Sequence, residues 1–235
     1  MLDELDLLLA AVTPDTDATG YRKAVLEDNV LHKAAASNRE KTFKLLRRLY
    51  ALEPNVCLFR EFRRLARFAS DDGHLLAGLL AMAREPLLRQ CLVMVLTVPV
   101  GESIGRQKFE DWIRSHAPGR YSESMYVSFS HNLYGSFYQI GYLGASVGKA
   151  RGRVRPKVGI AAATYAAFLD WLHGMSGVAL LNGTYSTALD LGADEHIALL
   201  TAAGRQGLLK AAYSGGVLDL NFPGFLRADE ARLTQ

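Results

Sequence analysis

Apolar residues recur at intervals of three and four along most of the chain, which is the period of an amphipathic α-helix. In residues 37–52, Phe43, Leu46, Leu49 and Tyr50 form one apolar stripe, and basic side chains occupy the opposite face. Similar spacing predicts further helices over residues 20–35, 57–70, 71–83, 85–98, 105–119, 121–141, 161–175, 186–192 and 192–207. The chain is therefore predicted to be mainly α-helical.

Residues at the ends of these segments predict where the helices begin and stop. Ser37, with Glu40 three positions later, has the spacing of a capping box. Pro86 suits the first turn of a helix, and Ser122 suits an N-cap. Gly141 is expected to stop the helix over residues 121–141 in the left-handed conformation.

Two segments break the helical period and predict β-structure. Residues 142–146 and 153–160 are short extended candidates around a Gly- and Arg-rich turn, with Pro156 restricting the second strand to an edge or its start. Residues 211–222 predict a terminal β-rich piece that turns at Gly215-Gly216. We expect an N-terminal helical bundle, then a winged-helix-like segment with a basic β-hairpin, then further helices. The predicted domains are residues 1–119, which carry basic helices, and residues 120–235.

Charge is distributed unevenly along the chain. The formal net charge is only +3, but residues 20–70 hold twelve Lys or Arg against five acidic residues. Residues 148–159 hold five basic side chains and no acidic one. Arg151, Arg153 and Arg155 alternate in this run, so they share one face if strand geometry extends through it. Two basic blocks could build one basic surface.

No motif for catalysis, metal binding or nucleotide binding is complete. The stretch GASVGKA lacks the features of a Walker A loop, because Leu143 and Ala150 stand where Gly and a hydroxyl residue are needed. The His residues never lie at i and i+4 or near a Cys pair, and no GxSxG elbow accompanies His131. Cys57 and Cys91 lie in apolar surroundings and are interpreted as reduced core thiols. We expect a protein without enzymatic activity, cofactor or metal.

The charge of the N-terminal segment and the make-up of the most apolar regions argue against a secreted or membrane protein. The N-terminal segment is acidic where a signal peptide requires positive charge. The most apolar regions are interrupted by charged residues and by Pro86, so neither offers about 18 uninterrupted apolar residues for a membrane span. A cytoplasmic location is expected.

Binding of nucleic acid is the function that the pattern favours. A capped helix followed by a basic hairpin resembles a winged helix, in which the helix enters a DNA groove and the hairpin meets the neighbouring phosphates. The candidate contacts of the hairpin are Lys149, Arg151, Arg153, Arg155 and Lys157. Those of the helix are Ser122, Ser124, Tyr126, Ser128, His131 and Asn132. Weaker candidates on the N-terminal basic helices are Arg47, Arg48, Arg63 and Arg64.

Three stretches of the chain resemble the BrxA family of bacterial BREX phage-defence systems. They are residues 25–52 with the run RRLY, residues 75–89 with AREPLLR, and the region from SFYQIGYL through LDWLHGMSGVALL to AAYSGGVLDLNF. The resemblance implies a small, mainly helical, non-catalytic, DNA-binding protein, and we expect double-stranded DNA to be its partner. It also implies partners among other BREX proteins, namely a methyltransferase, an ATPase and a phosphatase-like component.

Two other functions remain open from the sequence. In the first, the chain is an assembly adaptor that holds other defence proteins together, and the basic hairpin docks an acidic partner. In the second, the basic helical half binds RNA. Competition between RNA and duplex DNA, and co-purification of partners after nuclease treatment, distinguish these functions from DNA binding.

Overall fold

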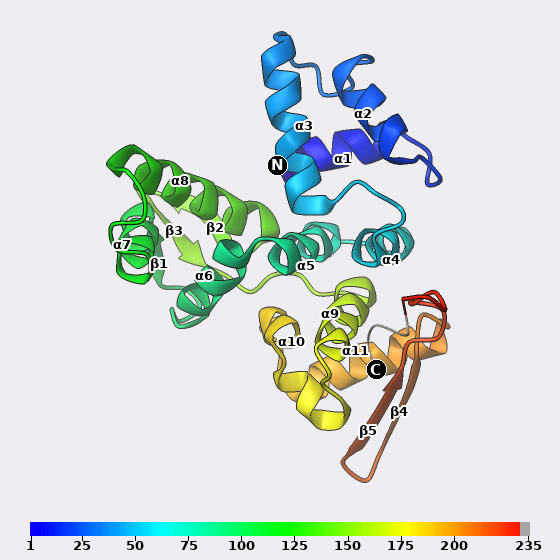
Figure 1. Cartoon of the computed structure of the whole chain (residues 1–235). Helices are drawn as coiled ribbons and strands as arrows, with labels where there is room; N and C mark the ends of the chain where they lie inside the picture. The colour runs from blue at the N-terminus through cyan, green and yellow to red at the C-terminus, as the bar shows by residue number, and fades with distance from the viewer. Residues whose placement is uncertain (231–235) are drawn as a thin grey trace.

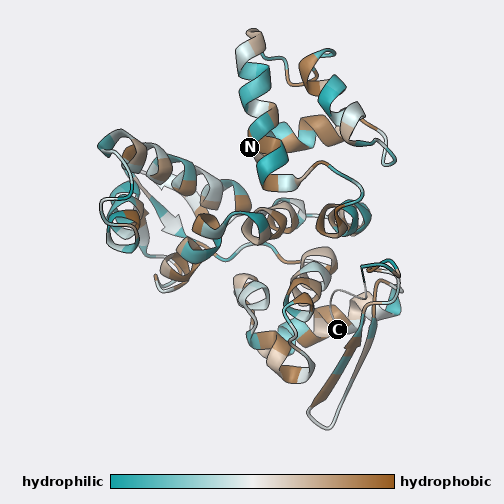
Figure 2. Ribbon diagram, in the orientation of Figure 1, coloured by the Kyte–Doolittle hydropathy of each residue, from teal (hydrophilic) through white to brown (hydrophobic). Residues whose placement is uncertain are grey.

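The computed structural model describes residues 1–230, which form a mainly helical chain with two small antiparallel sheets in that range (Figure 1). Apolar and polar residues alternate along most of the helices, as amphipathic packing requires (Figure 2). The large helical content predicted from the periodicity is confirmed.

The N-terminal part is built around helix α5. Its elements are α1 (Leu2–Ala11), α2 (Ala18–Leu26), α3 (Ala36–Tyr50), α4 (Cys57–Leu65), the 3₁₀ helix η1 (Ala66–Phe68) and α5 (Gly73–Arg84). Residues 75–82 of α5 are all buried, because α5 packs against α3 and α4 and also against the later helices α8 and α9. This helix therefore joins the N-terminal part to the rest of the core.

The middle part combines three helices with a three-stranded sheet. Its elements are α6 (Pro86–Leu96), β1 (Ser103–Gly105), α7 (Arg106–His116), α8 (Glu123–Ile140), β2 (Leu143–Val147) and β3 (Ala150–Arg153). The strand order is β1-β3-β2 and both pairings are antiparallel, with Ile104 opposite Arg151 and Val147 opposite Ala150. The predicted division at residue 119 stays a prediction, and the β1–β3 pairing and the α7–α8 packing both cross it.

The C-terminal part repeats a similar order, with helices followed by a hairpin. Its elements are α9 (Ile160–Leu172), the 3₁₀ helix η2 (Gly177–Asn182), α10 (Thr184–Ala188), α11 (Ala193–Arg205), β4 (Lys210–Ser214) and β5 (Val217–Asn221). Residues 161–170 of α9 are all buried, and many of them are Ala, so α5, α10 and α11 pack closely against α9. The predicted turn at Gly215-Gly216 is confirmed, since both residues have positive φ.

The N-terminus of α9 is capped by a side chain from another part of the chain. Asp72 is buried beside the start of α5, and its Oδ2 accepts hydrogen bonds from the backbone N–H groups of Gly159 (3.1 Å) and Ala162 (2.9 Å). A Cβ at position 159 would lie 2.7 Å from this oxygen. The absence of a side chain at Gly159 therefore makes room for the cap, which satisfies otherwise unpaired N–H groups.

The N-terminus of α10 is capped in the same way by Asp170 of α9. The buried carboxylate accepts hydrogen bonds from the N–H groups of Tyr185 (3.1 Å) and Ser186 (2.6 Å). A Cβ at Gly183 would overlap the carboxylate. Burial raises the pKa of Asp170, and the two N–H donors act in the opposite direction.

Several predicted boundaries are wrong. The helix predicted over residues 20–35 ends at Leu26, because Asn29 and His32 adopt positive φ and cannot continue it. The predicted capping box at Ser37 does not form, since α3 begins at Ala36. The second strand of the basic hairpin is Ala150–Arg153, earlier than predicted, and strand β1 was not predicted. Pro86 and Gly141 take their predicted positions at the start of α6 and the end of α8.

Candidate nucleic-acid interface

Helix α8 is held in place by its apolar side. Leu133, Phe137 and Ile140 are buried, and Phe137 packs against Phe109 of α7 with ring centroids 5.7 Å apart. At the start of the helix, Ser122 takes its predicted N-cap position, but its side chain makes no capping hydrogen bond. The opposite side of the helix remains exposed.

The single acidic residue of α8 is neutralised by an arginine. Glu123 accepts two hydrogen bonds from the guanidinium of Arg114, at 3.0 and 2.6 Å, and this contact lowers the pKa of Glu123. From Ser124 to Ile140 the helix carries no acidic side chain. The outward face of α8 is therefore compatible with a polyanion. Its exposed polar and aromatic members are Ser124, Ser128, His131, Asn132 and Tyr138.

Two arginines from neighbouring elements flank this face. Arg106, at the start of α7, contacts Nε2 of His131. Arg151, in β3, stacks over the ring of Tyr138 at 3.6 Å from the centroid and donates a hydrogen bond to the carbonyl of Gly144 (2.9 Å). These contacts hold both guanidinium groups beside the exposed side of α8, where they add positive charge.

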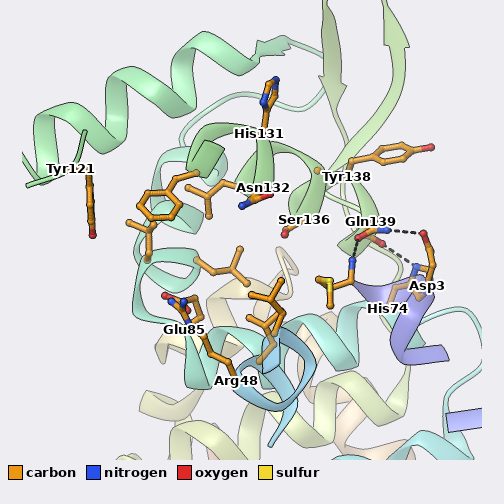
Figure 3. A pocket seen from close by; sticks show the side chains of 18 residues that line it. Asp3, Arg48, His74, Glu85, Tyr121, His131, Asn132, Ser136, Tyr138 and Gln139 are labelled. Atoms are coloured by element: carbon orange, nitrogen blue, oxygen red, sulfur yellow. Dashed lines mark hydrogen bonds and ion pairs between the residues drawn. The ribbon is translucent and has the colours of Figure 1, made fainter. Parts of the chain in front are cut away.

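A groove of about 960 Å³ separates α8 from the N-terminal part (Figure 3). Asn132 and Ser136 point into the groove, whereas His131 points away from it (Figure 3). On the opposite wall, Arg48 of α3 is paired with Glu85. Apolar side chains form much of the remaining surface, and they include Leu45, Leu49, Leu87, Tyr121 and Phe129.

The basic face of α3 borders the same groove. A second hollow of about 460 Å³ shares Arg48 with the groove and is also lined by Lys44, Arg47 and Arg84. Helix α3 is hydrophilic along much of its length (Figure 2). The basic block of residues 20–70 therefore contributes side chains to the groove and to the hollow beside it, whereas no residue of the second basic block, residues 148–159, lines either of them.

The interpretation of Arg153 as an exposed contact is wrong. This side chain is 1% exposed, forms an ion pair with Asp190 at 2.7 Å, and donates to the carbonyl of Val95 at 3.3 Å. Strand β3 ends at Arg153, so strand geometry does not extend to Arg155 and the three arginines do not share one face. Arg153 instead joins the middle sheet to the loop between α10 and α11.

The other basic side chains in residues 148–159 differ in their exposure and in whether they form ion pairs. Lys149 lies exposed at the turn between β2 and β3. Arg155 is 61% exposed and lies 4.0 Å from Asp190. Lys157 pairs with Asp71 at 2.9 Å, and this pair lowers the pKa of the aspartate. The positive charge at the hairpin is therefore smaller than the sequence count indicates.

Tyr126 also does not belong to the exposed surface. Its ring is buried, and its hydroxyl donates to the carbonyl of Ala117 at 2.6 Å. The hydroxyls of Ser122 and Ser124 contact each other at 3.1 Å, and both residues are exposed. Ser128, His131 and Asn132, which the sequence also singled out, are exposed on α8 as expected for a binding surface.

The N-terminal arginines are partly used in packing. Arg64 donates to Glu61 at 2.6 Å and stacks over Phe225 at 4.1 Å. Arg63 is half-buried and donates to the carbonyl of Thr13 at 3.4 Å. Arg47, in contrast, is exposed, and Arg48 keeps 63% of its side chain exposed despite its ion pair.

Sequence reasoning missed Arg106 and Tyr138 as members of the surface. Arg106 directly follows strand β1, and recognition of that strand would have placed it beside α8. Tyr138 lies fourteen residues after Ser124 in α8, on the same side of the helix by the 3.6-residue period. Its position was visible in the sequence, but its contact with Arg151 was not.

Within residues 1–230, no cluster of three or more His, Cys, Asp or Glu side chains is arranged to hold a metal ion. No helix in the same range is both long and apolar enough to cross a membrane. Comparison of the chain with known protein families, with curated proteins and with solved structures finds no match.

Proposed function

We propose that the protein is a non-enzymatic accessory component of a bacterial BREX anti-phage system that binds duplex DNA, mainly through phosphates. The observation that carries the proposal is the acid-free outward face of α8, flanked by Arg106 and Arg151. The family resemblance of the sequence adds the biological setting.

The order of the middle part supports a winged-helix mode of binding. A helix, a short strand, two helices and a two-stranded hairpin follow one another, and the first strand pairs with the last. In winged-helix proteins the third helix enters the major groove, and here that helix is α8. At 18 residues it is about 27 Å long, and the major groove is about 12 Å wide, enough to admit one helix.

The side chains of this face divide into two kinds of contact. Lys149, Arg151 and Arg106 carry positive charge for phosphates beside the groove. Ser128 and Asn132 offer donors and acceptors of the kind that bond base edges. Most of the affinity is expected from the phosphate contacts, with modest sequence preference. Lys44 and Arg47 of α3, which line the separate hollow beside Arg48, are further candidates for phosphate contacts.

A salt series tests this proposal directly. Binding of a fluorescent duplex is measured by anisotropy, and neutralisation of about five phosphates predicts a slope of log affinity against log salt near −4 to −5. Substitution of both Arg106 and Arg151 by Ala should reduce the slope by about 2 and weaken binding to all sequences. Arg205→Ala, on the exposed end of α11, is the matched control and should change neither. A flat salt response, or preference for RNA in competition, would overturn the proposal.

The apolar lining of the groove favours a second candidate function, that of an assembly adaptor. Leu45 is 46% exposed at the groove, and Phe129 and Leu87 line the same space. Exposed apolar surface of this kind is typical of protein–protein contacts. After nuclease treatment of the lysate, the protein should still co-purify with the methyltransferase, ATPase or phosphatase-like component, and Leu45→Glu should abolish this co-purification. If the same variant keeps its affinity for duplex DNA, the adaptor function is separate from DNA binding.

A further inference from the structure

The hairpin β4–β5 has a surface unlike that of the basic hairpin. Both follow three helices in the chain, but β4 and β5 together carry one basic residue, Lys210, and one acidic residue, Asp219. Such a hairpin has little charge to offer a phosphate backbone. It projects from the C-terminal part (Figure 1), and its two faces differ in burial.

One face of this hairpin is already occupied by the fold. Leu218 and Leu220 are buried and lie opposite Tyr213 and Ala211 in the register. On the same face, α11 approaches β4 closely, because a Cβ on Gly204 would lie 3.2 Å from the Cβ of Ala211. The other face is exposed throughout and consists of Lys210, Ala212, Ser214, Val217, Asp219 and Asn221.

The edge of β4 has unpaired backbone groups. In residues 1–230, no backbone hydrogen bond joins β4 or β5 to any element other than its partner strand. The 3₁₀ helix η2 packs beside β5, and α11 packs against β4 on the occupied face near Ala211. In Figure 1, β4 lies on the side of the hairpin away from β5 and η2. Natural sheets protect such edges with charges, Pro or bulges. Strand β4 has one Lys at its beginning and then the small or polar sequence AAYS.

The residues of β4 are complementary to a second copy of the same strand. Antiparallel pairing of two β4 strands about Ala212 places Lys210 opposite Ser214 of the second copy, and Tyr213 opposite Ala211 of the second copy. No like charges meet, and each large ring lies over a small side chain. The corresponding pairing of two β5 strands would set Asp219 directly opposite itself, which is destabilising.

We propose that β4 is a self-association edge, through which two copies of this chain form a continuous four-stranded antiparallel sheet. The contact is isologous, so it closes at a dimer rather than growing into a filament. It lies in the C-terminal part, away from the outward face of α8, and does not depend on the proposed DNA binding.

Sedimentation velocity of the full chain, at concentrations up to about 0.1 mM, tests the proposal. The wild-type chain should shift from monomer to dimer as concentration rises. Ala212→Lys should raise the dimer dissociation constant about tenfold or more, because two lysines meet at the symmetry axis. Within one chain this Lys lies opposite Asp219, so the hairpin itself gains a favourable pair and should stay folded.

The matched control is Val217→Lys, which places the same charge at a 68% exposed position on the other strand and should leave dimerisation unchanged. Hydrogen exchange of the wild-type chain adds a readout free of mutation, since the β4 amides should become protected as concentration rises. A monomer at all concentrations overturns the proposal. The proposal is also overturned if Ala212→Lys dimerises like wild type, or if Val217→Lys weakens the dimer as much as Ala212→Lys does.

Discussion

His196 should make the stability of the fold depend on pH between about 4 and 6.5. Its side chain is 2% exposed at the start of α11. Burial lowers the pKa of His196 to about 4, and a hydrogen bond to the backbone of Ala163 in α9 acts in the opposite direction. In the unfolded chain the same group titrates near its ordinary value of about 6.5.

The magnitude follows from this difference. A folded pKa of about 4 against an unfolded value of 6.5 corresponds to about 3 kcal/mol of unfolding free energy, at about 1.4 kcal/mol per pKa unit. Because the folded pKa is depressed, the unfolded state binds the proton first. The contribution is therefore complete above pH 6.5 and is lost as pH falls toward 4, with about 2 kcal/mol gone at pH 5.

Urea unfolding at a series of pH values measures this contribution by difference. His196→Gln removes the titration, and His116→Gln is the control because that side chain is exposed. Wild type and control should lose about 2 kcal/mol more than His196→Gln between pH 7 and pH 5. Asp170 and Glu61, whose pKa values are raised by burial, favour the folded state at low pH in all variants and cancel in the comparison. Parallel stability curves for wild type and His196→Gln would refute the reasoning.

Three further changes have defined outcomes. Gly78→Ala should destabilise the fold by about 1–3 kcal/mol in urea unfolding despite its better helix propensity, because a Cβ there would lie 2.8 Å from the buried side chain of Ile140; an unchanged midpoint would contradict this. Asp170→Asn should cost about 2–3 kcal/mol, since an amide accepts at one atom only where the carboxylate now accepts at two; equal thermal melting would contradict it. In duplex-binding anisotropy, Tyr138→Ala should weaken affinity about three- to fivefold by releasing Arg151, whereas Tyr138→Phe should not; equal losses would point to the hydroxyl instead.

Amphipathic spacing was sufficient to predict most helices, since each stripe of apolar residues is visible within one short segment and becomes the buried face of the helix. Gly141 was predictable for the same reason, because a left-handed helix end favours Gly whatever lies around it. Strand β1 has only three residues, Ser103–Gly105, and is too short to show an alternation. It exists because β3 pairs with it, and that partner lies far along the chain.

The candidate site was less predictable, because side-chain roles there depend on distant partners. Because arginine is charged, the sequence predicts that Arg153 is exposed. In the fold, the ion pair with Asp190 compensates the cost of burying its charge. Tyr126 is removed from the surface by the carbonyl of Ala117. In contrast, Ser128 and Asn132 lie outside the apolar stripe of α8, so the helical period alone predicts that they are exposed.

The two aspartate caps have a consequence for how the chain folds during its synthesis. Asp72 precedes α9 in the chain, and Asp170 precedes α10. As the chain grows from its N-terminus, each carboxylate is therefore made before the N–H groups that it will bind. Neither α9 nor α10 has a capping side chain at its own N-cap residue, so each gains its side-chain cap only when it docks against earlier helices. The direction of translation and the order of assembly thus coincide, and a fragment that begins at α9 would lack the cap on its first helix.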